Sequence, residues 1–408
     1  MQGMLLAILV ALSLGSVALG VVWLIVLVRV RRTARDLPSA DRGIAMAGHS
    51  PPVGRVCVVV PAHNEAGKIG RLVRSLRAQT HADLRVVLCL DRCTDTTLDE
   101  AREAIGDDDR FEVLEIGECP IDWAGKVNAV QTGVDRSDGA READWLLFTD
   151  ADTEFDPECV RATLAIACDR NDGLLSLLST LSDGRWFERV VQPMSGLELV
   201  RQYPLARASD DDPERRRAFA NGQFMLFRRD VYDDIGGHEP VHDALLEDIA
   251  LAELVRQTGA GASLLLAGGM VRCSMYDDWD EYRRGWKRIY TECAGRKSAR
   301  LRRHARVART IGALLPACGV GALLVGISLV MGGRPMGWVG LGTGGAGVLI
   351  WLVGVAGVLR SGRALVWSAP ITPLGAWLNG SILREAARDL DRGTPTSWGG
   401  REYARQAR

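Results

Sequence analysis

Two aspartates separated by one residue give the strongest chemical signal in this sequence. Asp150 and Asp152 follow the apolar run from Trp145 to Thr149, which is typical of a strand buried on both faces. Two carboxylates at the end of such a strand can hold a hard divalent cation against a phosphate-bearing ligand, and a nucleotide-diphosphate donor is a ligand of that kind. Acidic residues are also common in solvated turns after strands, so the pair needs support from other parts of the chain.

Two strands upstream of this pair also end in polar turns that contain an acid. The run Val56 to Val60 leads into Pro61, Ala62, His63, Asn64 and Glu65, and the run Leu84 to Leu90 leads into Asp91. Continuous apolar strands separated by helical stretches are typical of a mostly parallel sheet covered by helices on both faces. Ligands bind such sheets at the carboxyl ends of the strands. We therefore expect these turns and the aspartate pair to share one edge of an α/β, Rossmann-like sheet.

Other motifs limit the kind of site. No GxGxxG or GxxxxGK[ST] accompanies the strands, which disfavours a dinucleotide cradle or an ATPase loop. Later in the chain, Glu247 and Asp248 stand in the first turn of a predicted helix, where acids also serve as ordinary partners of the helix dipole. These two acids therefore need context before they are assigned a chemical role.

Composition excludes several classes. The chain has 408 residues and a formal net charge of -1, so no bulk affinity for nucleic acid is expected. The nine cysteines are scattered without a paired CxxC spacing, which argues against a zinc site or a disulfide framework. The length and apolar content suffice for one large domain or two modest ones.

The N-terminus predicts a membrane anchor. Met4 to Val28 is long and apolar enough to cross a bilayer as a helix, and Arg29, Arg31, Arg32 and Arg35 follow it. A cleaved signal peptide is the alternative, because Ala18-Leu19-Gly20 resembles a cleavage site. The apolar block continues past that point and has no basic residue ahead of it, so an uncleaved anchor with its basic end in the cytoplasm is favoured.

The C-terminal part predicts a helical hairpin in the membrane. Residues 311–330 and 338–359 are apolar and rich in Gly and Ala, with arginines outside both outer ends. Residues 364–383 are also apolar, but Pro370 and Pro373 interrupt them, so they can lie in the interface, re-enter or span.

Seven motifs in order resemble the family 2 glycosyltransferases, which have the GT-A fold. They are VVVPAHNE, DRCTDTT, WAGKVNAV, FTDAD, ANGQFMLFRR, IGGH and LLEDIAL, and they cover roughly Arg55 to Gly295. The Ala220 to Gln223 segment, the membrane hairpin and the tail Trp398 to Tyr403 look closest to glycosyltransferases that act on polyisoprenoid products, the carotenoid-acid and hopanoid-associated members.

The resemblance implies a role for each matching residue on the donor side. Residues that match a nucleoside cradle are Pro61, Ala62, His63, Asn64, Glu65 and Asp91. Asp91 would accept a hydrogen bond from the base and Glu65 would face the ribose. Lys126 would face the diphosphate or the sugar, although a lysine at a helix start is otherwise an ordinary surface residue.

The resemblance also implies the metal and the base. Asp152 would bind Mg²⁺ or Mn²⁺, and Asp150 would contact the ribose or the metal. Asp248 would take the proton from the acceptor hydroxyl, with Glu247 beside it. His238 and His242 would complete the metal or acceptor site, although a hydrogen-bonded structural role is the commoner one for a histidine.

The chain departs from the family in one motif. Processive polysaccharide synthases carry QxxRW after the catalytic acid, and the corresponding stretch here, Tyr282 to Arg288, lacks the Gln and the Arg-Trp pair. Polymer synthesis is therefore not expected. Arg284, Trp286 and Arg288 remain candidates for clamping diphosphate or acceptor, and a tryptophan here can also lie at the membrane surface.

The leading hypothesis is a membrane-bound, inverting, non-processive glycosyltransferase at the cytoplasmic (inner) membrane. It would move one sugar from a nucleotide-diphosphate sugar, expected to be a UDP-sugar, to a lipid-like acceptor, with its catalytic part in the cytoplasm. A membrane-bound nucleotidyltransferase and a noncatalytic nucleotide-sugar-binding scaffold are the alternatives. The expected parts are an anchor (1–35), a linker (36–54), a GT-A domain (55–300), a C-terminal membrane region (301–384) and a cytoplasmic tail (385–408).

Overall fold

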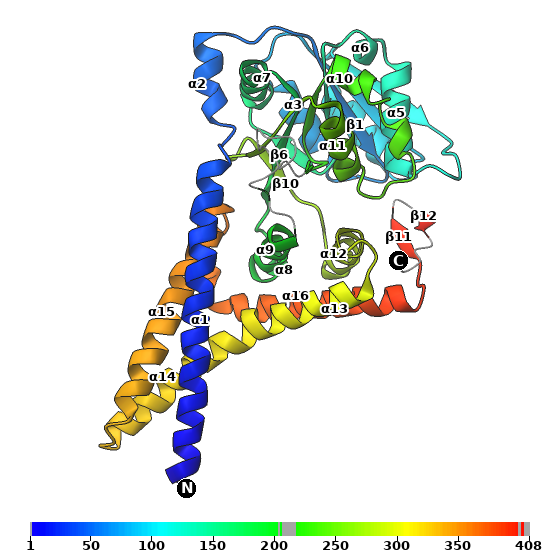
Figure 1. The fold of residues 1–408 in the computed structure, drawn as a ribbon. Coiled ribbons are helices and arrows are strands. Elements are labelled where there is room, and N and C mark those ends of the chain that lie inside the picture. The colour runs from blue at the N-terminus through cyan, green and yellow to red at the C-terminus, as the bar shows by residue number, and fades with distance from the viewer. Residues whose placement is uncertain (1, 203–204, 206–217, 399–400, 404–408) are drawn as a thin grey trace.

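The computed structural model describes residues 2–202, 205, 218–398 and 401–403. It has an α/β domain, a layer of helices beneath that domain, and long helices that extend away from both (Figure 1).

The α/β domain is built on a seven-stranded sheet in the order β3-β2-β1-β4-β8-β6-β9. Its strands are β1 (Val56–Ala62), β2 (Leu84–Asp91), β3 (Phe111–Ile116), β4 (Trp145–Phe148), β6 (Asp172–Leu178), β8 (Met225–Arg228) and β9 (Gly261–Leu266). All neighbouring strands are parallel except β8, which is antiparallel to both β4 and β6. The expected α/β class with a mostly parallel sheet is confirmed.

Helices cover both faces of this sheet, as the continuous apolar strands predict. One face carries α3 (Ile69–Arg77), α4 (Thr97–Ile105) and α7 (Cys159–Arg170). The other carries α5 (Gly125–Arg136), α6 (Asp138–Arg141), α10 (Arg229–Asp234) and α11 (Glu247–Thr258). Alternate β1 residues serve the two faces, since Val58 packs into the first core and Val59 into the second.

Two smaller sheets complete the described strands. One joins β5 (Thr153–Phe155), β10 (Val271–Cys273) and β7 (Thr180–Leu181), and the other is the C-terminal pair β11 (Thr396–Trp398) and β12 (Arg401–Tyr403). The stretch 36–54, which the sequence suggests as a linker, contains helix α2 (Arg42–His49) packed on α7.

Among the residues that the structure describes, three helices are long and apolar enough to cross a membrane. They are α1 (Gln2–Asp36), the continuous helix formed by α13 (Ser298–Arg309), η3 (Thr310–Leu314) and α14 (Leu315–Met331), and α15 (Gly337–Ser361). The predicted segments 311–330 and 338–359 lie within the last two helices. α14 and α15 form the expected hairpin, and α1 packs against both.

The segment 364–383 forms η4 (Val366–Ile371) and most of α16 (Thr372–Asp391), and it is not among the candidate spans of the described residues. α16 runs crosswise to α1 and α15 and lies beside α13 (Figure 1). We call α16, α13, α8 (Trp186–Val190), α9 (Gln192–Gln202) and α12 (Trp279–Cys293) the basal layer. A buried hydrogen-bond network ties this layer together, since Ser195 Oγ lies 2.8 Å from the Tyr282 hydroxyl and donates to Asn379 Oδ1 at 3.0 Å.

Small residues let the long helices approach closely. A Cβ atom added at Gly347 on α15 would lie 2.7 Å from the Ser16 carbonyl oxygen on α1 and would also overlap the Ser16 hydroxyl. The same serine hydroxyl donates to the Thr343 carbonyl at 2.8 Å, so the two helices also share a hydrogen bond. A side chain at position 347 therefore cannot be accommodated without separating α1 from α15.

We predict that Gly347→Val destabilises the protein by about 1–3 kcal/mol, because overpacking against backbone forces the helices apart. Thermal unfolding in detergent micelles measures the effect. Gly342→Val is the matched control, since a Cβ added at Gly342 on the same helix meets nothing within 4 Å. Equal unfolding temperatures for the two variants would contradict the proposed packing.

Candidate active site

The carboxyl ends of β1, β2 and β4 meet at one edge of the main sheet. The parallel register that pairs Val59 with Val87 and with Phe148 brings the turns after these strands together. The expectation that Glu65, Asp91 and Asp150 share an edge therefore agrees with the strand pairing.

Hydroxyl groups fix the turn that holds the aspartate pair. Thr149 Oγ1 donates to the Gln223 carbonyl at 2.8 Å, and Thr153 Oγ1 donates to the Asp150 carbonyl at 2.8 Å. The buried Cys273 thiol donates to Asp152 Oδ1 at 3.3 Å, because β5 pairs with β10. Asp150 and Asp152 thus stand on a turn braced from three different segments.

Lys126 connects this turn to a distant part of the chain. Its Nζ lies 2.7 Å from Asp150 Oδ1 and 2.5 Å from Glu247 Oε1. Side-chain exposures are 17% for Lys126 and 5% for Glu247, so the contact is shielded from water. The start of α5, the end of β4 and the start of α11 therefore converge on one ammonium group.

Gly222 makes room for this convergence. Its N–H donates to Asp248 Oδ2 at 3.0 Å. A Cβ added at Gly222 would lie 2.9 Å from Lys126 Nζ and 3.4 Å from Glu247 Oε1. A side chain at this position would require the Lys126 ammonium group to move from its place between the acids.

The electrostatics of the edge are dominated by acids. Around Lys68 and Lys126, five carboxylates interact with these two ammonium groups or with one another: Glu65, Asp150, Asp152, Glu247 and Asp248. Burial first, and then the charge of Asp150, raise the pKa of Asp152 to about 6. Burial and the charges of Asp152 and Asp150 raise the pKa of Glu65 to about 7, against the opposing charge of Lys68.

The pKa values of the adjacent acids Glu247 and Asp248 are shifted in opposite directions. Burial disfavours ionisation of Glu247, but the charge and hydrogen bond of Lys126 outweigh it, and the pKa of Glu247 is lowered. Burial and the neighbouring Glu247 charge raise the pKa of Asp248 to about 6. A carboxyl group with a pKa just below neutrality is suited to accept a proton, so Asp248 has the properties of a general base.

The turn after β1 lies against the end of β2. His63 Nδ1 is 2.6 Å from the Asp91 carbonyl oxygen, and the Thr94 N–H donates to Asn64 Oδ1 at 2.8 Å. Both Asp91 carboxylate oxygens accept from Arg92, at 2.8 and 2.7 Å. The residues predicted to cradle a nucleoside are therefore neighbours, and Arg92 already occupies the Asp91 carboxylate.

The two candidate histidines lie in different surroundings. His238 is buried behind Glu247 and Lys126, with Nδ1 2.8 Å from the Tyr232 hydroxyl, and burial lowers the pKa of this imidazole to about 4. His242 is half-buried with its ring against Trp123, and its carbonyl accepts from the Ala124 N–H at 2.7 Å. His238 is thus near enough to Glu247 and Lys126 for electrostatic interaction, whereas His242 contacts the start of α5 through its carbonyl.

The three candidates on α12, Arg284, Trp286 and Arg288, do not all lie beside the acids of the candidate site. Trp286 is buried in the basal layer between Tyr282 and Tyr290. Arg284 is exposed. Arg288 is close enough to the half-buried Tyr276 to act on it electrostatically, and Tyr276 in turn interacts with Asp152. Only Arg288 of these three is thus connected to the aspartate pair, through one intervening residue.

A divalent cation is compatible with the aspartate pair. Within the described part of the chain, no three His, Cys, Asp or Glu side chains form a group able to hold a metal by themselves. Mg²⁺ usually binds through one or two carboxylates, with waters and ligand phosphates completing its shell, so a full protein cage is not required. Asp152 beside Asp150 supplies such carboxylates, and a cation there would relieve their mutual repulsion.

Sequence reasoning missed several residues at this edge. They are Lys68, Arg92, Gly222, Cys273, Tyr276 and Tyr403. The spacing of Lys68 three residues after Glu65 signals an ion pair, which is present at 3.5 Å. No local signal predicts that the Gly125 N–H donates to the Tyr403 hydroxyl at 3.4 Å, because the two residues are 278 positions apart.

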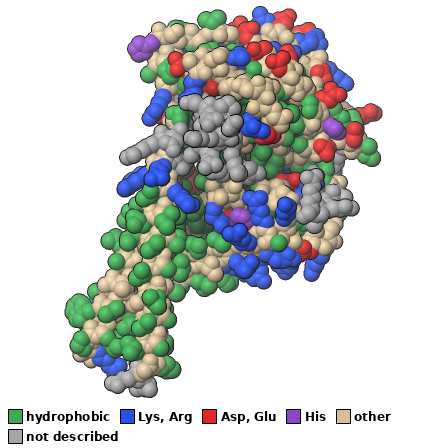
Figure 2. All heavy atoms as spheres, viewed as in Figure 1, with side chains coloured by type: hydrophobic (Ala, Val, Ile, Leu, Met, Phe, Trp, Pro, Cys, Tyr) green, Lys and Arg blue, Asp and Glu red, His purple; other side chains and the backbone are tan. Residues whose placement is uncertain are grey.

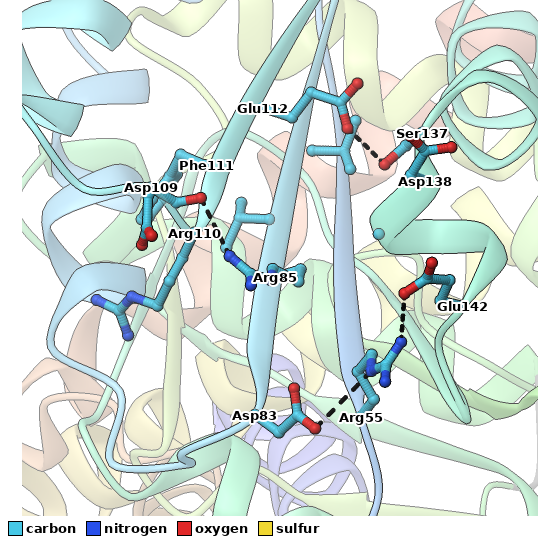
Figure 3. A pocket seen from close by; sticks show the side chains of 13 residues that line it. Arg55, Asp83, Arg85, Asp109, Arg110, Phe111, Glu112, Ser137, Asp138 and Glu142 are labelled. Atoms are coloured by element: carbon cyan, nitrogen blue, oxygen red, sulfur yellow. Dashed lines mark hydrogen bonds and ion pairs between the residues drawn. The ribbon is translucent and has the colours of Figure 1, made fainter.

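A polar hollow of about 430 Å³ lies at the opposite, amino-terminal edge of β1, β2 and β3. Figure 3 shows Arg55 in contact with both Asp83 and Glu142, and Glu112 in contact with Ser137. Since the hollow lies at the amino ends of the strands, remote from their carboxyl ends, it is not part of the candidate site.

Comparison with known proteins agrees with this architecture. Residues 57–236 match the model of Glycosyl transferase family 2, a segment that contains Asp91, Lys126, Asp150 and Asp152 but ends before Glu247. The match covers less than half of the chain, and the sheet with its helices has the expected GT-A fold. No curated protein matches the chain.

Two solved structures are similar over most of the chain. Mannosyltransferase PcManGT from Pyrobaculum calidifontis, in complex with GDP-Man and Mn²⁺, is 18% identical, with a TM-score of 0.49 and coverage of 94% of this chain and 98% of that one. S. aureus TarS 1–349, in complex with UDP-GlcNAc, is 13% identical, with a TM-score of 0.40 and coverage of 86% and 96%.

We predict that Lys126→Met destabilises the protein by about 3–5 kcal/mol, because it leaves buried carboxylates without a counter-charge. The loss should depend on pH. In the variant, Lys126 no longer outweighs burial, which is the largest influence on the pKa of Glu247, so we expect its folded-state pKa to rise above the ordinary value of 4.5 and stability to fall as pH rises through that value. Below it Glu247 is protonated in both states, and the difference from wild type shrinks.

Thermal unfolding between acidic and neutral pH measures this dependence. Adding Glu247→Gln to Lys126→Met should restore part of the stability at neutral pH, since a neutral amide costs less to bury than an unpaired carboxylate. A loss that is the same at every pH would show that packing, not charge, is what Lys126 supplies.

Proposed function

We propose that the protein is a membrane-bound inverting glycosyltransferase of the hexosyltransferase type. It transfers one sugar from a nucleotide-diphosphate sugar to a lipid-like acceptor, depends on Mg²⁺ or Mn²⁺, and is non-processive. The observation that carries the proposal is the bridge from Asp150 through Lys126 to Glu247, with Asp248 adjacent. It joins the acids expected to serve the donor to the acid expected to serve the acceptor.

On the donor side, Pro61 to Glu65 and Asp91 surround the nucleoside. Asp91 with Arg92 presents a charged, rigid pair next to Gly125 at the start of α5. Lys126 faces the diphosphate, where its ammonium group offsets negative charge. We propose a UDP-sugar as the donor.

Asp152, with Asp150, would hold the divalent cation. When bound, that cation neutralises charge on the departing diphosphate. The protein's own contribution is to keep the two carboxylates on the turn braced by Thr149 and Thr153 and to place Lys126 beside them.

On the acceptor side, Asp248 removes the proton from the attacking hydroxyl, which leads to in-line displacement with inversion. The Gly222 N–H donates to one carboxylate oxygen of Asp248. The other carboxylate oxygen of Asp248 accepts from the Ile249 N–H. Both contacts orient the carboxylate before the acceptor arrives.

The membrane part supports a lipid-like, polyisoprenoid type of acceptor. Arg29, Arg309 and Arg360 stand at the ends of the spans that lie on the side of the α/β domain, whereas Arg334 stands in the turn between α14 and α15 (Figure 1). By the positive-inside rule, we propose a multi-pass protein of the inner membrane with its catalytic domain in the cytoplasm. An apolar acceptor is concentrated by the same bilayer.

The test is the product released from a nucleotide-diphosphate sugar by the full chain with membrane lipids and Mn²⁺ or Mg²⁺. Release of nucleoside diphosphate with a glycosylated lipid supports the proposal, whereas release of pyrophosphate indicates a nucleotidyltransferase. No turnover with any donor that binds would favour a noncatalytic scaffold.

We predict that Asp152→Asn lowers metal-dependent turnover by at least about 100-fold, because an amide of the same shape lacks the charge that holds a hard cation. Binding of Mn²⁺ in the presence of nucleoside diphosphate, followed by electron paramagnetic resonance, should weaken in parallel. Asp156→Asn, the same change near the far end of β5, is the control and should leave both measurements unchanged.

We predict that kcat/KM rises with pH and levels off above about 6, because burial and Glu247 raise the pKa of Asp248 to about 6 and only the ionised carboxylate accepts a proton. Asp248→Asn should lower kcat by roughly 100- to 10,000-fold and remove this limb of the profile. A variant that keeps most of its activity would instead indicate a carboxylate acceptor, which has no proton to remove.

A further inference from the structure

One face of α16 carries an unusual sequence of exposed side chains. Leu374, Trp377, Ser381, Arg384 and Arg388 are spaced by three or four residues and therefore lie on one face of the helix. Leu374 and Trp377 are 54% and 44% exposed, and both arginines are also exposed. The face is apolar toward the N-terminal end of the helix and basic toward the other end.

Arg309 at the end of α13 completes this face. Its guanidinium carbon lies 4.4 Å from the centre of the Trp377 ring, and Nη2 donates to Ser381 Oγ at 2.6 Å. The charges of Arg384 and Arg388 are near enough to act on it. We call Arg309, Arg384 and Arg388 the arginine cluster.

No acid among the described residues compensates this cluster. The acids of α16 are paired with bases of α12 and α13, in the contacts Glu385 with Arg283, Asp389 with Lys287 and Asp391 with Arg302. Arg309 Nε is buried and has no hydrogen-bond partner in the described structure. The cluster thus brings guanidinium groups of like charge together, and the Nε–H of Arg309 makes no hydrogen bond in the described structure.

The helix dipole, the usual reason for a base near the end of a helix, explains only one of the three arginines. Arg388 stands in the last turn of α16, where a base interacts favourably with the helix dipole by about 0.3–1 kcal/mol. That effect does not explain Arg384 in the preceding turn or Arg309 on the neighbouring helix. A bound anion would explain all three positions.

The surroundings indicate the source of the anion. Arg309 stands at the end of α13, and the η3 segment connects it directly to the apolar helix α14. Figure 2 shows Lys and Arg side chains gathered over the basal layer, next to the hydrophobic surface of the long helices. A phosphate that reaches the arginines while apolar chains contact Leu374 and Trp377 belongs to a lipid.

We propose that the arginine cluster binds the headgroup phosphate of an anionic phospholipid at the cytoplasmic membrane surface. Guanidinium groups donate forked hydrogen bonds to phosphate oxygens, and Trp377 beneath Arg309 holds the cluster at the depth of the headgroups. The proposal rests on the proposed membrane association, and it places the basal layer flat against the bilayer beneath the active site.

The test uses the full chain in neutral detergent micelles and titrates it with acyl-labelled dansyl phosphatidylglycerol or phosphatidylcholine, read by energy transfer from tryptophan. The wild type should prefer phosphatidylglycerol. Arg384→Gln with Arg388→Gln should weaken that binding by roughly 30-fold, about fivefold for each charge removed, and leave phosphatidylcholine binding unchanged. Both arginines are exposed, so the variant should fold like the wild type in thermal unfolding.

The control removes two exposed charges elsewhere, with Arg71→Gln and Arg74→Gln on α3, and should keep the full preference. Equal weakening by the control would overturn the proposal, because net charge alone would then explain binding. Displacement of labelled phosphatidylglycerol by millimolar inorganic phosphate would also overturn it in favour of a free-anion site.

Alkaline carbonate extraction of wild-type membranes separates this inference from the proposed function. Retention in the membrane without a preference for phosphatidylglycerol would defeat only the inference. Release of the protein would defeat the membrane association on which both depend.

Discussion

The ammonium group of Lys126, held between Asp150 and Glu247, is the interaction on which the rest of the site depends. A charge shielded from water is stable only when it is paired at close range, so this lysine forces the starts of α5 and α11 to meet the end of β4. The same pairing makes Gly222 necessary, because its backbone must pass within contact of the lysine and both acids. One ion bridge therefore sets the spacing between the aspartate pair after β4 and the acids at the start of α11.

Carboxylates outnumber ammonium groups around this bridge. The excess negative charge makes ionisation harder for particular carboxylates. Lys126 keeps Glu247 ionised, whereas the pKa values of Asp152, Asp248 and Glu65 are all raised. The edge is therefore suited to two different events, cation binding and proton uptake. A cation at Asp152 would replace protons there, and proton uptake by Asp248 is the step expected of a base.

Much of the sheet and half of the site follow from the sequence, because continuous apolar runs define buried parallel strands and their carboxyl ends must share an edge. Asp150 is placed in this way. The approach of Glu247 depends instead on β8 entering the sheet antiparallel between β4 and β6, which no local pattern specifies. Trp286 was a candidate for ligand contact, but its amphipathic helix buries it against Tyr282 and Tyr290. The sequence of one helix does not show which of its faces will be covered, because that depends on how the helices of the basal layer pack together.

The basal layer and the active site are joined by charge as well as by the chain. Lys68 lies 3.5 Å from Glu65 and 3.2 Å from Asp277, and Asp277 lies 2.5 Å from Arg185 at the start of α8. Asp277 lies two residues before the start of α12, so the relay links two helices of the layer to an acid at the sheet edge. Asp277 is itself 54% exposed, and a single exposed pair of this kind contributes little stability. The contribution of the relay is to position the cluster: if the basal layer lies against the bilayer as proposed, the relay would hold the acid cluster at a fixed height above the lipid surface.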